Sequence, residues 1–454
     1  MINHLPLAGL GFAAILVVGC IFLLILDKPL LVIYTQIIYS CFMRILISNL
    51  HFPDFIKYFS DFLTVVLFVQ IVLQLNKTKT LNIRKPMFII ILFLIAGIFS
   101  TAYNGASLIF FSWGMRTYIK FFVFFLACTI FLKLADIERL IKFLLKIFPV
   151  NIALVVIQYF VLGYSDDYIG GLFGSERGCN AEMNLYLIAI AVITIIFYVY
   201  KKIEFRNFAF NSIGICAIAA LSELKIVFII YLFVLLVTIV FSFPNKRAIT
   251  ISIVGVFILL ISIPVFMVLY PNWAEVFSDI NKVRYEFFEI RYEGPNTNSL
   301  SRLSAGTYIS HNLLTTPMQK LFGIGFGNAS TFLNISSSFY TRYKELRYIW
   351  FFYSLMLTEI GIIGLIIYCL FFLSVIYESF RIKRKLNENC IFYCYISFII
   401  SMIVFPLLVY NASLNMDAAF IFFFTFSFPF ILEKETYESN IENKRQNRIY
   451  DSIK

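Results

Sequence analysis

The stretch from residue 224 to residue 242 is LKIVFIIYLFVLLVTIVFS, and its only charged side chain is Lys225, near its start. A helix needs about 20 predominantly apolar residues to cross the hydrocarbon layer of a bilayer. Since that layer offers no water to pair with backbone amides and carbonyls, a run of this kind is expected to cross it as a helix. The stretch therefore predicts one transmembrane span.

Runs of the same kind follow one another along most of the chain. They predict an all-α polytopic membrane protein with about thirteen transmembrane helices, within a range of about 12–14. The first run, Leu5 to Leu26, is long enough to span, so we expect it to stay in the mature protein and not to be a cleaved signal peptide. The expected spans are residues 5–26, 29–48, 56–75, 87–104, 108–132, 147–164, 183–200, 207–222, 224–242, 248–270, 347–377, 390–411 and 416–432.

The composition excludes a water-soluble globular protein. Of the 454 residues, 61% are hydrophobic and 14% are charged, whereas a soluble chain carries about a quarter charged residues. The mean hydropathy is +0.87. The formal net charge is +11. In a soluble protein that charge would suggest nucleic acid, but in a membrane protein it marks the cytoplasmic loops. We therefore expect membrane lipid as a partner and no nucleic acid.

Basic loops predict which helix ends face the cytoplasm. Four such loops fall on one side of the expected spans. The segment from Lys133 to Lys146 falls there too, as an amphipathic helix lying in the interface. The basic residues of the four loops are Lys77, Lys79, Arg84 and Lys85; Lys201, Lys202 and Arg206; Lys246 and Arg247; and Arg381, Lys383, Arg384 and Lys385.

The hydrophobic pattern is interrupted at length only from Pro271 to Leu346, where charged residues mix with Asn, Ser, Gly and aromatic residues. A connection this long is uncommon without a function. We expect four regions: transmembrane helices 1–10 in residues 1–270, a large periplasmic loop with short helices in residues 271–346, transmembrane helices 11–13 in residues 347–432, and a mobile cytoplasmic tail in residues 433–454.

The cysteines and histidines do not predict a metal site. Of the eight cysteines, all but Cys179 lie within or at the edge of apolar runs, which is not a disulfide framework. The chain has only three histidines, and Cys390 and Cys394 are spaced to share one helix face and not to form a metal knuckle. We expect neither a bound metal nor a cofactor.

Charged side chains in or beside spans are costly, so each one needs a partner or a function. Arg44 and Asp61 are expected to form an internal ion pair or to extend to the interface. Arg116 and Lys120 lie one helical turn apart and put two cations on one helix face. The full set is Arg44, Asp61, Arg116, Lys120, Glu223, Lys225 and Glu359.

Four basic residues are expected in, or within reach of, the outer half of the bundle. Cations that converge without an acidic metal cradle suit a diphosphate, because Arg pairs with phosphate oxygens bidentately and keeps its charge when desolvated. The alternative interpretation is that they are scattered interface anchors. These residues are Arg116, Arg177, Lys225 and Arg302.

The long loop contains a candidate helix and a glycine-rich turn. Ser299 or Ser301 could cap a helix that runs to about Lys320. The sequence LFGIGFG follows at residues 321–327, and its glycines, Gly323, Gly325 and Gly327, allow backbone amides to approach a ligand or a neighbouring helix closely. A dinucleotide-binding site is excluded, because no strand precedes this motif and no βαβ unit fits a membrane protein.

This layout resembles the bacterial O-antigen polymerase and O-antigen ligase superfamily. The resemblance rests on Arg302, a helix of about twenty residues, Pro317, the LFGIGFG turn, and a span bearing EIGIIGL at residues 359–365. IGGLFG at residues 169–174 and SELK at residues 222–225 agree with it. The resemblance implies a GT-C-like glycosyltransferase architecture in the bacterial inner membrane, multi-pass, with the large loop periplasmic and the C-terminus cytoplasmic.

The resemblance also implies an activity. Members of this superfamily move a glycan from undecaprenyl pyrophosphate to a hydroxyl group at the periplasmic face, and periplasmic arginines stabilise the pyrophosphate leaving group. By its position, Arg302 is expected to take that role, with Lys225 and Arg177 as further candidates. The implied partners are undecaprenyl-pyrophosphate-linked oligosaccharides, a chain-length regulator and a flippase.

One departure favours the polymerase over the ligase. Ligases of this superfamily carry a His-Asn pair about nine residues before the Glu-x-Gly of the span after the loop, and that position is Trp350 here. His311 lies elsewhere, where an ordinary polar helix residue is the simpler interpretation. The general base is left open among Glu359, His311, Asp166 and Asp167.

Two other classes of function fit parts of the sequence. A flippase for lipid-linked oligosaccharides also has twelve to fourteen spans and internal cations, but its length is spread over short, even connections, and this chain has one long loop. A structural assembly partner would need no chemistry. Loss of a polymerase should leave lipopolysaccharide with a single repeat unit, whereas loss of a flippase should leave none.

Overall fold

The computed structural model describes residues 27–74, 84–242, 245–292, 298–332, 335–386 and 390–438, together with Gly19. Apart from Gly19, the expected first span lies outside the described residues. So do residues 439–454 of the expected tail, and Lys77 and Lys79 of the first basic loop.

Ten helices in the described residues are long and apolar enough to cross a membrane. They confirm the prediction of an all-α, multi-pass membrane protein, because strands in the described ranges occur only as two short hairpins. The helices are α2 (Pro29–Ser48), α3 (Phe59–Gln74, after a 3₁₀ turn at Asp54–Tyr58), α4 (Arg84–Tyr103), α5 (Leu108–Phe131), α6 (Leu134–Val156), α7 (Cys179–Val199), α9 (Lys225–Ser242), α10 (Lys246–Leu269), α16 (Phe352–Lys383) and α17 (Ile391–Tyr410).

Two further expected spans are shorter than their hydrophobic runs suggested. Helix α8 (Phe205–Leu221) has 17 residues, fewer than the roughly 20 that a span needs. Helix α18 (Ala419–Phe426) has eight residues and stops at a turn at Ser427, after which the chain is helical again to residue 438. The side chain of Ser427 donates a hydrogen bond to the carbonyl of Phe424, which competes with the regular helix pattern at this point.

The structure corrects the prediction of an interfacial helix at residues 133–146. These residues begin α6, which continues as a π-turn to Val161 and forms one candidate span, Leu134–Val161. Its buried residues include Leu140, Leu144 and Phe148, each one helical turn from the next. The amphipathic face therefore packs against the protein and not against the membrane surface.

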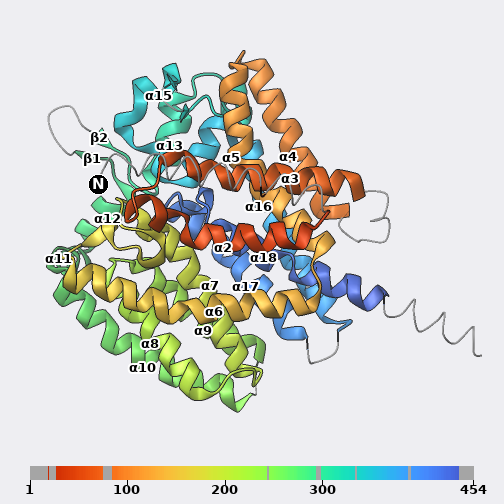
Figure 1. Cartoon of the computed structure of the whole chain (residues 1–454). Helices are drawn as coiled ribbons and strands as arrows, with labels where there is room; N and C mark the ends of the chain where they lie inside the picture. Colours follow the sequence, from red (N-terminus) through yellow and green to blue (C-terminus); the bar gives the residue numbers. More distant parts are fainter. Residues whose placement is uncertain are drawn as a thin grey trace, which may run out of the picture.

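Helix α7 forms the centre of one half of the bundle and is buried along its whole length. It contacts α8, α9, α10 and α17, and a helix that is apolar on every side is expected in such a position. The other half joins α2, α3, α4 and α5 to α16 and α18. In Figure 1, α2–α5 (red to orange) lie above α6–α10 (yellow to green).

The described parts of the basic loops lie together at one end of the bundle, here called the basic end. Lys85 pairs with Glu378 (3.6 Å), and Arg247 donates to the carbonyl of Tyr198 (3.3 Å). Arg381 pairs with Glu433 (2.8 Å), and the Lys434 Nζ atom donates to the carbonyl of Leu132 (2.7 Å). The start of the expected mobile tail is thus helical and anchored, which corrects its boundary. In Figure 1 this end lies on the right.

The long segment between α10 and α16 packs at the opposite end, here called the outer end, on the left of Figure 1. It has a small hydrophobic core that includes Leu300, Ile309, Leu314 and Tyr348. Its elements are α11 (Pro271–Ser278), α12 (Ile280–Phe288), the hairpin β1 (Arg291–Tyr292) with β2 (Asn298–Ser299), α13 (Ser304–Tyr308, continued by a π-turn to Leu313), α14 (Pro317–Phe322), the hairpin β3 (Thr331–Phe332) with β4 (Ile335–Ser336), and α15 (Ser338–Tyr343).

The single helix expected from about residue 301 to Lys320 is broken in two. Thr316 has an extended backbone (φ −105°, ψ 151°), as is usual for the residue before a proline. Its side chain caps α14 by accepting from the amide of Gln319 (3.2 Å), and Pro317 occupies the first helical position. Ser301 is near the start of α13, where its hydroxyl accepts from the amide of Ser304 (3.4 Å).

Candidate functional site

Arg116 on α5 lies near the outer end of the bundle, where three cavities meet. Its Nη2 atom is 2.6 Å from Oδ2 of Asp61 on α3. Its guanidinium lies over the ring of Trp113, 4.0 Å from the ring centroid. Arg116 lines all three cavities, which makes it the residue common to the whole site.

The first cavity, the polar pocket, has a volume of about 280 Å³. Four basic side chains line it, and they come from α2, the 3₁₀ turn before α3, and α5. The basic residues are Arg44, Lys57, Arg116 and Lys120, and the remaining lining residues are Met43, Trp113, Thr117, Asn415, Met416 and Asp417.

Buried carboxylates hold these cations in place. The Lys120 Nζ atom is 2.6 Å from Oδ1 of Asp417, and both side chains are less than a tenth exposed. The Nε atom of Arg44 donates to Glu182 at the start of α7 (2.7 Å). Each of the four cations has a carboxylate partner, because Glu176 also lies 3.3 Å from Arg44 and Asp54 lies 3.9 Å from Lys57.

Arg44 and Asp61 each form an internal ion pair, as one of the two expected alternatives had it, but they do not pair with each other. Each of the two residues has another partner, because α7 brings Glu182 to Arg44 and α5 brings Arg116 to Asp61. Both pairs still follow the rule that charges inside a helical bundle are paired.

The second cavity, the apolar groove, has a volume of about 450 Å³ and runs between α3 and α5. Val65 and Phe68 on its α3 side are 58% and 54% exposed, as expected for residues that face lipid. Arg116 and Lys120 line both the groove and the polar pocket. The other lining residues are Asp61, Thr64, Phe111, Ser112, Met115, Ile119 and Val123.

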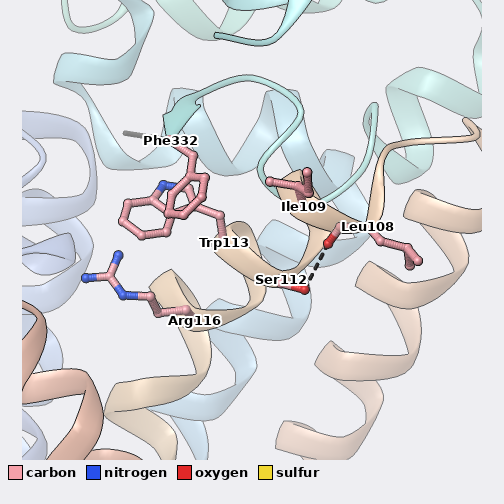
Figure 2. A pocket seen from close by; sticks show the side chains of 6 residues that line it. All are labelled: Leu108, Ile109, Ser112, Trp113, Arg116 and Phe332. Carbon is pink, nitrogen blue, oxygen red and sulfur yellow. Dashed lines mark hydrogen bonds between the residues drawn. The ribbon is translucent and has the colours of Figure 1, made fainter. Parts of the chain in front are cut away.

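The third cavity, the outer cavity, has a volume of about 500 Å³. Figure 2 shows the indole of Trp113 beside the ring of Phe332, with the Arg116 side chain next to them. The two ring centroids are 4.4 Å apart. Phe332 belongs to β3 of the long segment, so this cavity is shared between the long segment and the start of α5. It is also lined by Leu108, Ile109 and Ser112.

The glycine turn docks the long segment onto the spanning helices. Gly361 has φ 67° and ψ −171° inside α16, which interrupts that helix. The amides of Ile324 and Gly325 donate to the carbonyls of Thr358 and Glu359 at this break, both at 2.9 Å. An added Cβ at Gly323 would overlap the backbone of Glu359. Of the two expected roles, close approach to a neighbouring helix is the one seen.

Gly327 makes a similar contact with α5. An added Cβ there would overlap the carbonyl of Phe110, and one at Gly114 would overlap the backbone of Gly327. The ring of Phe326 fills the space beside Gly97 on α4. The backbone amide of Phe326 donates to the side-chain hydroxyl of Thr101 (3.1 Å). These contacts fix the chain that leads to Phe332 in the outer cavity.

Glu359 is buried beside the same turn and is not open to a substrate. The hydroxyl of Tyr118 donates to its Oε2 atom (3.0 Å). The carboxyl also interacts with the backbone amides of Gly327 and Ala329 and with the side chain of Ser330. With 2% exposure, Glu359 holds the turn to α5, so we do not retain it as a candidate base.

Arg302 and Lys225 lie near one another, in a cluster separate from the three cavities. The Lys225 Nζ atom is 2.7 Å from Oε1 of Glu223 and 3.5 Å from the ring centroid of Trp273. Electrostatic interactions link Lys225 to Arg302 and to Asp167. Of the four cations expected to converge, Lys225 and Arg302 thus lie near one another, whereas Arg116 lies at the three cavities.

The contacts of Arg302 are structural. Its Nε atom donates to the carbonyl of Tyr410 (3.1 Å), and its guanidinium lies 4.8 Å from the Tyr410 ring centroid. The hydroxyl of Tyr353 donates to its backbone carbonyl (2.5 Å). Arg302 thus ties the start of α13 to the ends of α16 and α17.

The remaining candidates lie in the outer loops. Arg177 and His311 are exposed and line none of the three cavities. The Asp167 carboxyl accepts from Asn180 (3.1 Å), whereas burial and the nearby Glu223 carboxylate raise the pKa of Asp166. Both aspartates lie in the 3₁₀ turn Asp166–Tyr168 beside the Lys225 cluster.

The three cavities together suit an amphiphile with an anionic head group. Cations in the polar pocket can pair with phosphate oxygens, and the adjoining groove offers apolar surface for a chain. Within the residues that the structure describes, no group of three or more His, Cys, Asp or Glu side chains could hold a metal ion.

Sequence reasoning singled out three cations of this site, Arg44, Arg116 and Lys120, but missed several neighbours. Asp417 could have been found, because it is an acidic residue at the start of a hydrophobic run. Lys57 and Trp113 gave no such signal, since an interfacial Lys or Trp is common in membrane proteins.

Comparisons with known proteins add no further assignment. No family model matches this sequence, and no curated protein or solved structure matches it either. A functional assignment therefore has to rest on the residues and the geometry described above.

Proposed function

We propose that this chain is a membrane glycosyltransferase that polymerises undecaprenyl-pyrophosphate-linked oligosaccharides, as O-antigen polymerases do, at the periplasmic face of a bacterial inner membrane. The layout of Arg302, the LFGIGFG turn and the Glu359 span supports this proposal by resemblance. The location of all three cavities at the end of the bundle opposite the basic loops is consistent with it.

The observation that carries the proposal is the position of Arg116 between the polar pocket and the apolar groove. A polyprenyl diphosphate has both a charged head and a long hydrocarbon chain. Its head would meet Arg44, Lys57, Arg116 and Lys120, while its chain would lie along Val65 and neighbouring residues of the groove. Arg116 is therefore a stronger candidate for diphosphate binding than Arg302, which lines none of the three cavities.

In the reaction, an acceptor hydroxyl forms a bond to the anomeric carbon as the bond from that carbon to the diphosphate oxygen breaks. The departing diphosphate gains negative charge, which a cation fixed beforehand stabilises. The carboxylates of Asp61 and Asp417 fix Arg116 and Lys120 in this way. Either carboxylate lines a cavity and could take the hydroxyl proton, so both join Asp166, Asp167 and His311 as candidate bases.

The proposal is tested in a strain that lacks the chain and is complemented with variants. With normal membrane levels, Arg116→Ala should leave lipopolysaccharide with a single repeat unit, because Arg116 would no longer stabilise the leaving group. Arg342→Ala is the matched control: this arginine is also at the outer end, but it lies exposed on α15. An unchanged ladder for Arg116→Ala would refute the proposal.

The same gel separates the alternatives. Loss of every repeat in the deletion strain would favour the flippase, and polymer that is made but not joined to lipid A would favour the ligase. Arg302→Ala adds a second comparison. A normal ladder for Arg302→Ala, beside a lost one for Arg116→Ala, would assign the diphosphate to the polar pocket and leave Arg302 a structural role. Activity that survives EDTA would agree with the expected metal independence.

A further inference from the structure

The outer cavity has features that the binding of a lipid diphosphate does not use. Its two aromatic rings, Trp113 and Phe332, contact one another at 4.4 Å between centroids and 49° between planes. Both side chains are half-buried, so part of each ring is accessible. Figure 2 shows them on one side of the cavity, with Ser112 and Arg116 below.

The outer cavity is continuous with the proposed lipid site through shared side chains. Trp113 and Arg116 line both the outer cavity and the polar pocket, whereas Ser112 and Arg116 line both the outer cavity and the apolar groove. Leu108 and Ile109, also in the outer cavity, form the first turn of α5, at the outer end. A molecule with its diphosphate at Arg116 would therefore extend its next group into the outer cavity.

We infer that the outer cavity is a glycan subsite, in which Trp113 and Phe332 bind the sugar attached directly to the lipid diphosphate. This inference rests on the proposed function. The C–H face of a pyranose is apolar and packs against an aromatic ring, and its hydroxyls need polar partners. The Ser112 hydroxyl donates to the carbonyl of Leu108 (2.8 Å) and keeps its lone pairs for accepting. Its volume of about 500 Å³ is within the usual range for a small-molecule pocket.

The subsite joins two parts of the chain that are far apart in sequence. Trp113 is held on α5 by the Arg116 guanidinium and by the edge of Tyr58, whose ring centroid is 5.9 Å away. Phe332 is placed by the glycine turn, through Gly327 and its contact with α5. Since both backbones are fixed against one another by this contact, the two rings form a preorganised surface, which lowers the entropy lost on binding.

The test compares two ligands on the full chain in lipid nanodiscs: undecaprenyl diphosphate, and the same lipid carrying one sugar of the repeat unit. The wild type should bind the glycosylated lipid more tightly. Phe332→Ala should reduce that preference by about 3- to 10-fold, the range expected for one lost aromatic contact. The affinity for undecaprenyl diphosphate itself should stay within about twofold, because Phe332→Ala leaves the pair of Arg116 with Trp113 in place.

Trp113→Ala and Trp350→Ala complete the series. Trp113→Ala should remove the sugar preference and also weaken the binding of both lipids, since Trp113 supports Arg116. Trp350→Ala is the matched control, because this tryptophan is 44% exposed at the outer end and lines none of the three cavities.

The outcomes separate this inference from the proposed function. An unchanged preference in Phe332→Ala and Trp113→Ala, with undecaprenyl diphosphate still bound, would overturn the glycan subsite alone. Equal weakening of both lipids in Phe332→Ala would overturn it as well, and would assign the outer cavity to the hydrocarbon chain. If the wild type binds neither lipid, both the subsite and the proposed function fail.

Discussion

Replacing Gly323 by alanine should release the glycine turn from α16. Gly323 has φ 75° and ψ −162°, a conformation that essentially only glycine adopts. A non-glycine residue there costs about 1–3 kcal/mol in backbone strain. In addition, the new Cβ would overlap the backbone of Glu359, so the turn has to move away from the helix.

That movement disrupts the two hydrogen bonds that join the glycine turn to α16, next to the interruption of this helix at Gly361. These bonds run from the amides of Ile324 and Gly325 to the carbonyls of Thr358 and Glu359, both at 2.9 Å. At about 1 kcal/mol each, their loss and the backbone strain add up to about 3–5 kcal/mol. A loss of this size is a large part of the stability of an ordinary folded domain.

Thermal unfolding of the purified protein in detergent, followed by tryptophan fluorescence, measures the effect. Gly105→Ala is the control, because Gly105 also has a positive φ (60°) but has nothing within 4 Å of an added Cβ. We expect it to cost only about 1–2 kcal/mol, the strain of a left-handed residue. If Gly323→Ala and Gly105→Ala lower the unfolding temperature equally, the docking of the glycine turn is not what stabilises this region.

Three further predictions use the same unfolding measurement. Lys120→Ala should lower the free energy of unfolding by about 3–5 kcal/mol, because it leaves the buried carboxylate of Asp417 unpaired. The double variant Lys120→Met with Asp417→Leu should recover much of this loss. Equal losses in the two variants would contradict the ion pair. Glu359→Ala should lower the free energy of unfolding by about 3 kcal/mol, because it leaves buried donors unpaired, and Glu359→Gln should lower it less. A loss of stability in Glu359→Ala below that of an exposed Glu→Ala change would contradict this. Burial and the Glu223 carboxylate raise the pKa of Asp166, so its ionisation destabilises the folded state as the pH rises through the acidic range. Asp166→Asn should thus be slightly more stable than the wild type at neutral pH, with the difference shrinking on acidification; a difference that does not change with pH would refute this.

The membrane fold could be predicted because hydrocarbon imposes a simple rule on long apolar runs. That rule gives the existence of a helix, but not its ends. The run at residues 416–432 has no charged residue after Asp417, and yet α18 stops at a turn at Ser427. Likewise, the amphipathic pattern from Lys133 to Lys146 fits both a membrane surface and a protein interior. The choice between the two depends on tertiary packing, which no local pattern contains.

The candidate site was predictable only in part. The spacing of Arg116 and Lys120 placed both cations on one face of α5, as the structure has them. Their pairing could not be predicted, because Asp61 on α3 and Asp417 in the turn before α18 are distant from α5 in sequence.

The break before Pro317 was visible in the sequence, since the residue before a proline rarely continues a helix. The glycine turn had two possible roles that only the packing could separate. Because Gly323, Gly327 and Gly361 all face backbone, the turn is part of the scaffold.

The most direct test of the account is the binding of undecaprenyl diphosphate to the full chain in lipid nanodiscs, with wild type, Arg116→Ala and Arg342→Ala compared. Loss of a charge-assisted contact to the diphosphate should weaken binding by about 10- to 100-fold in Arg116→Ala. Arg342→Ala should bind as the wild type does. Equal affinities in all three proteins would contradict the assignment of the diphosphate to the polar pocket, and with it the central claim.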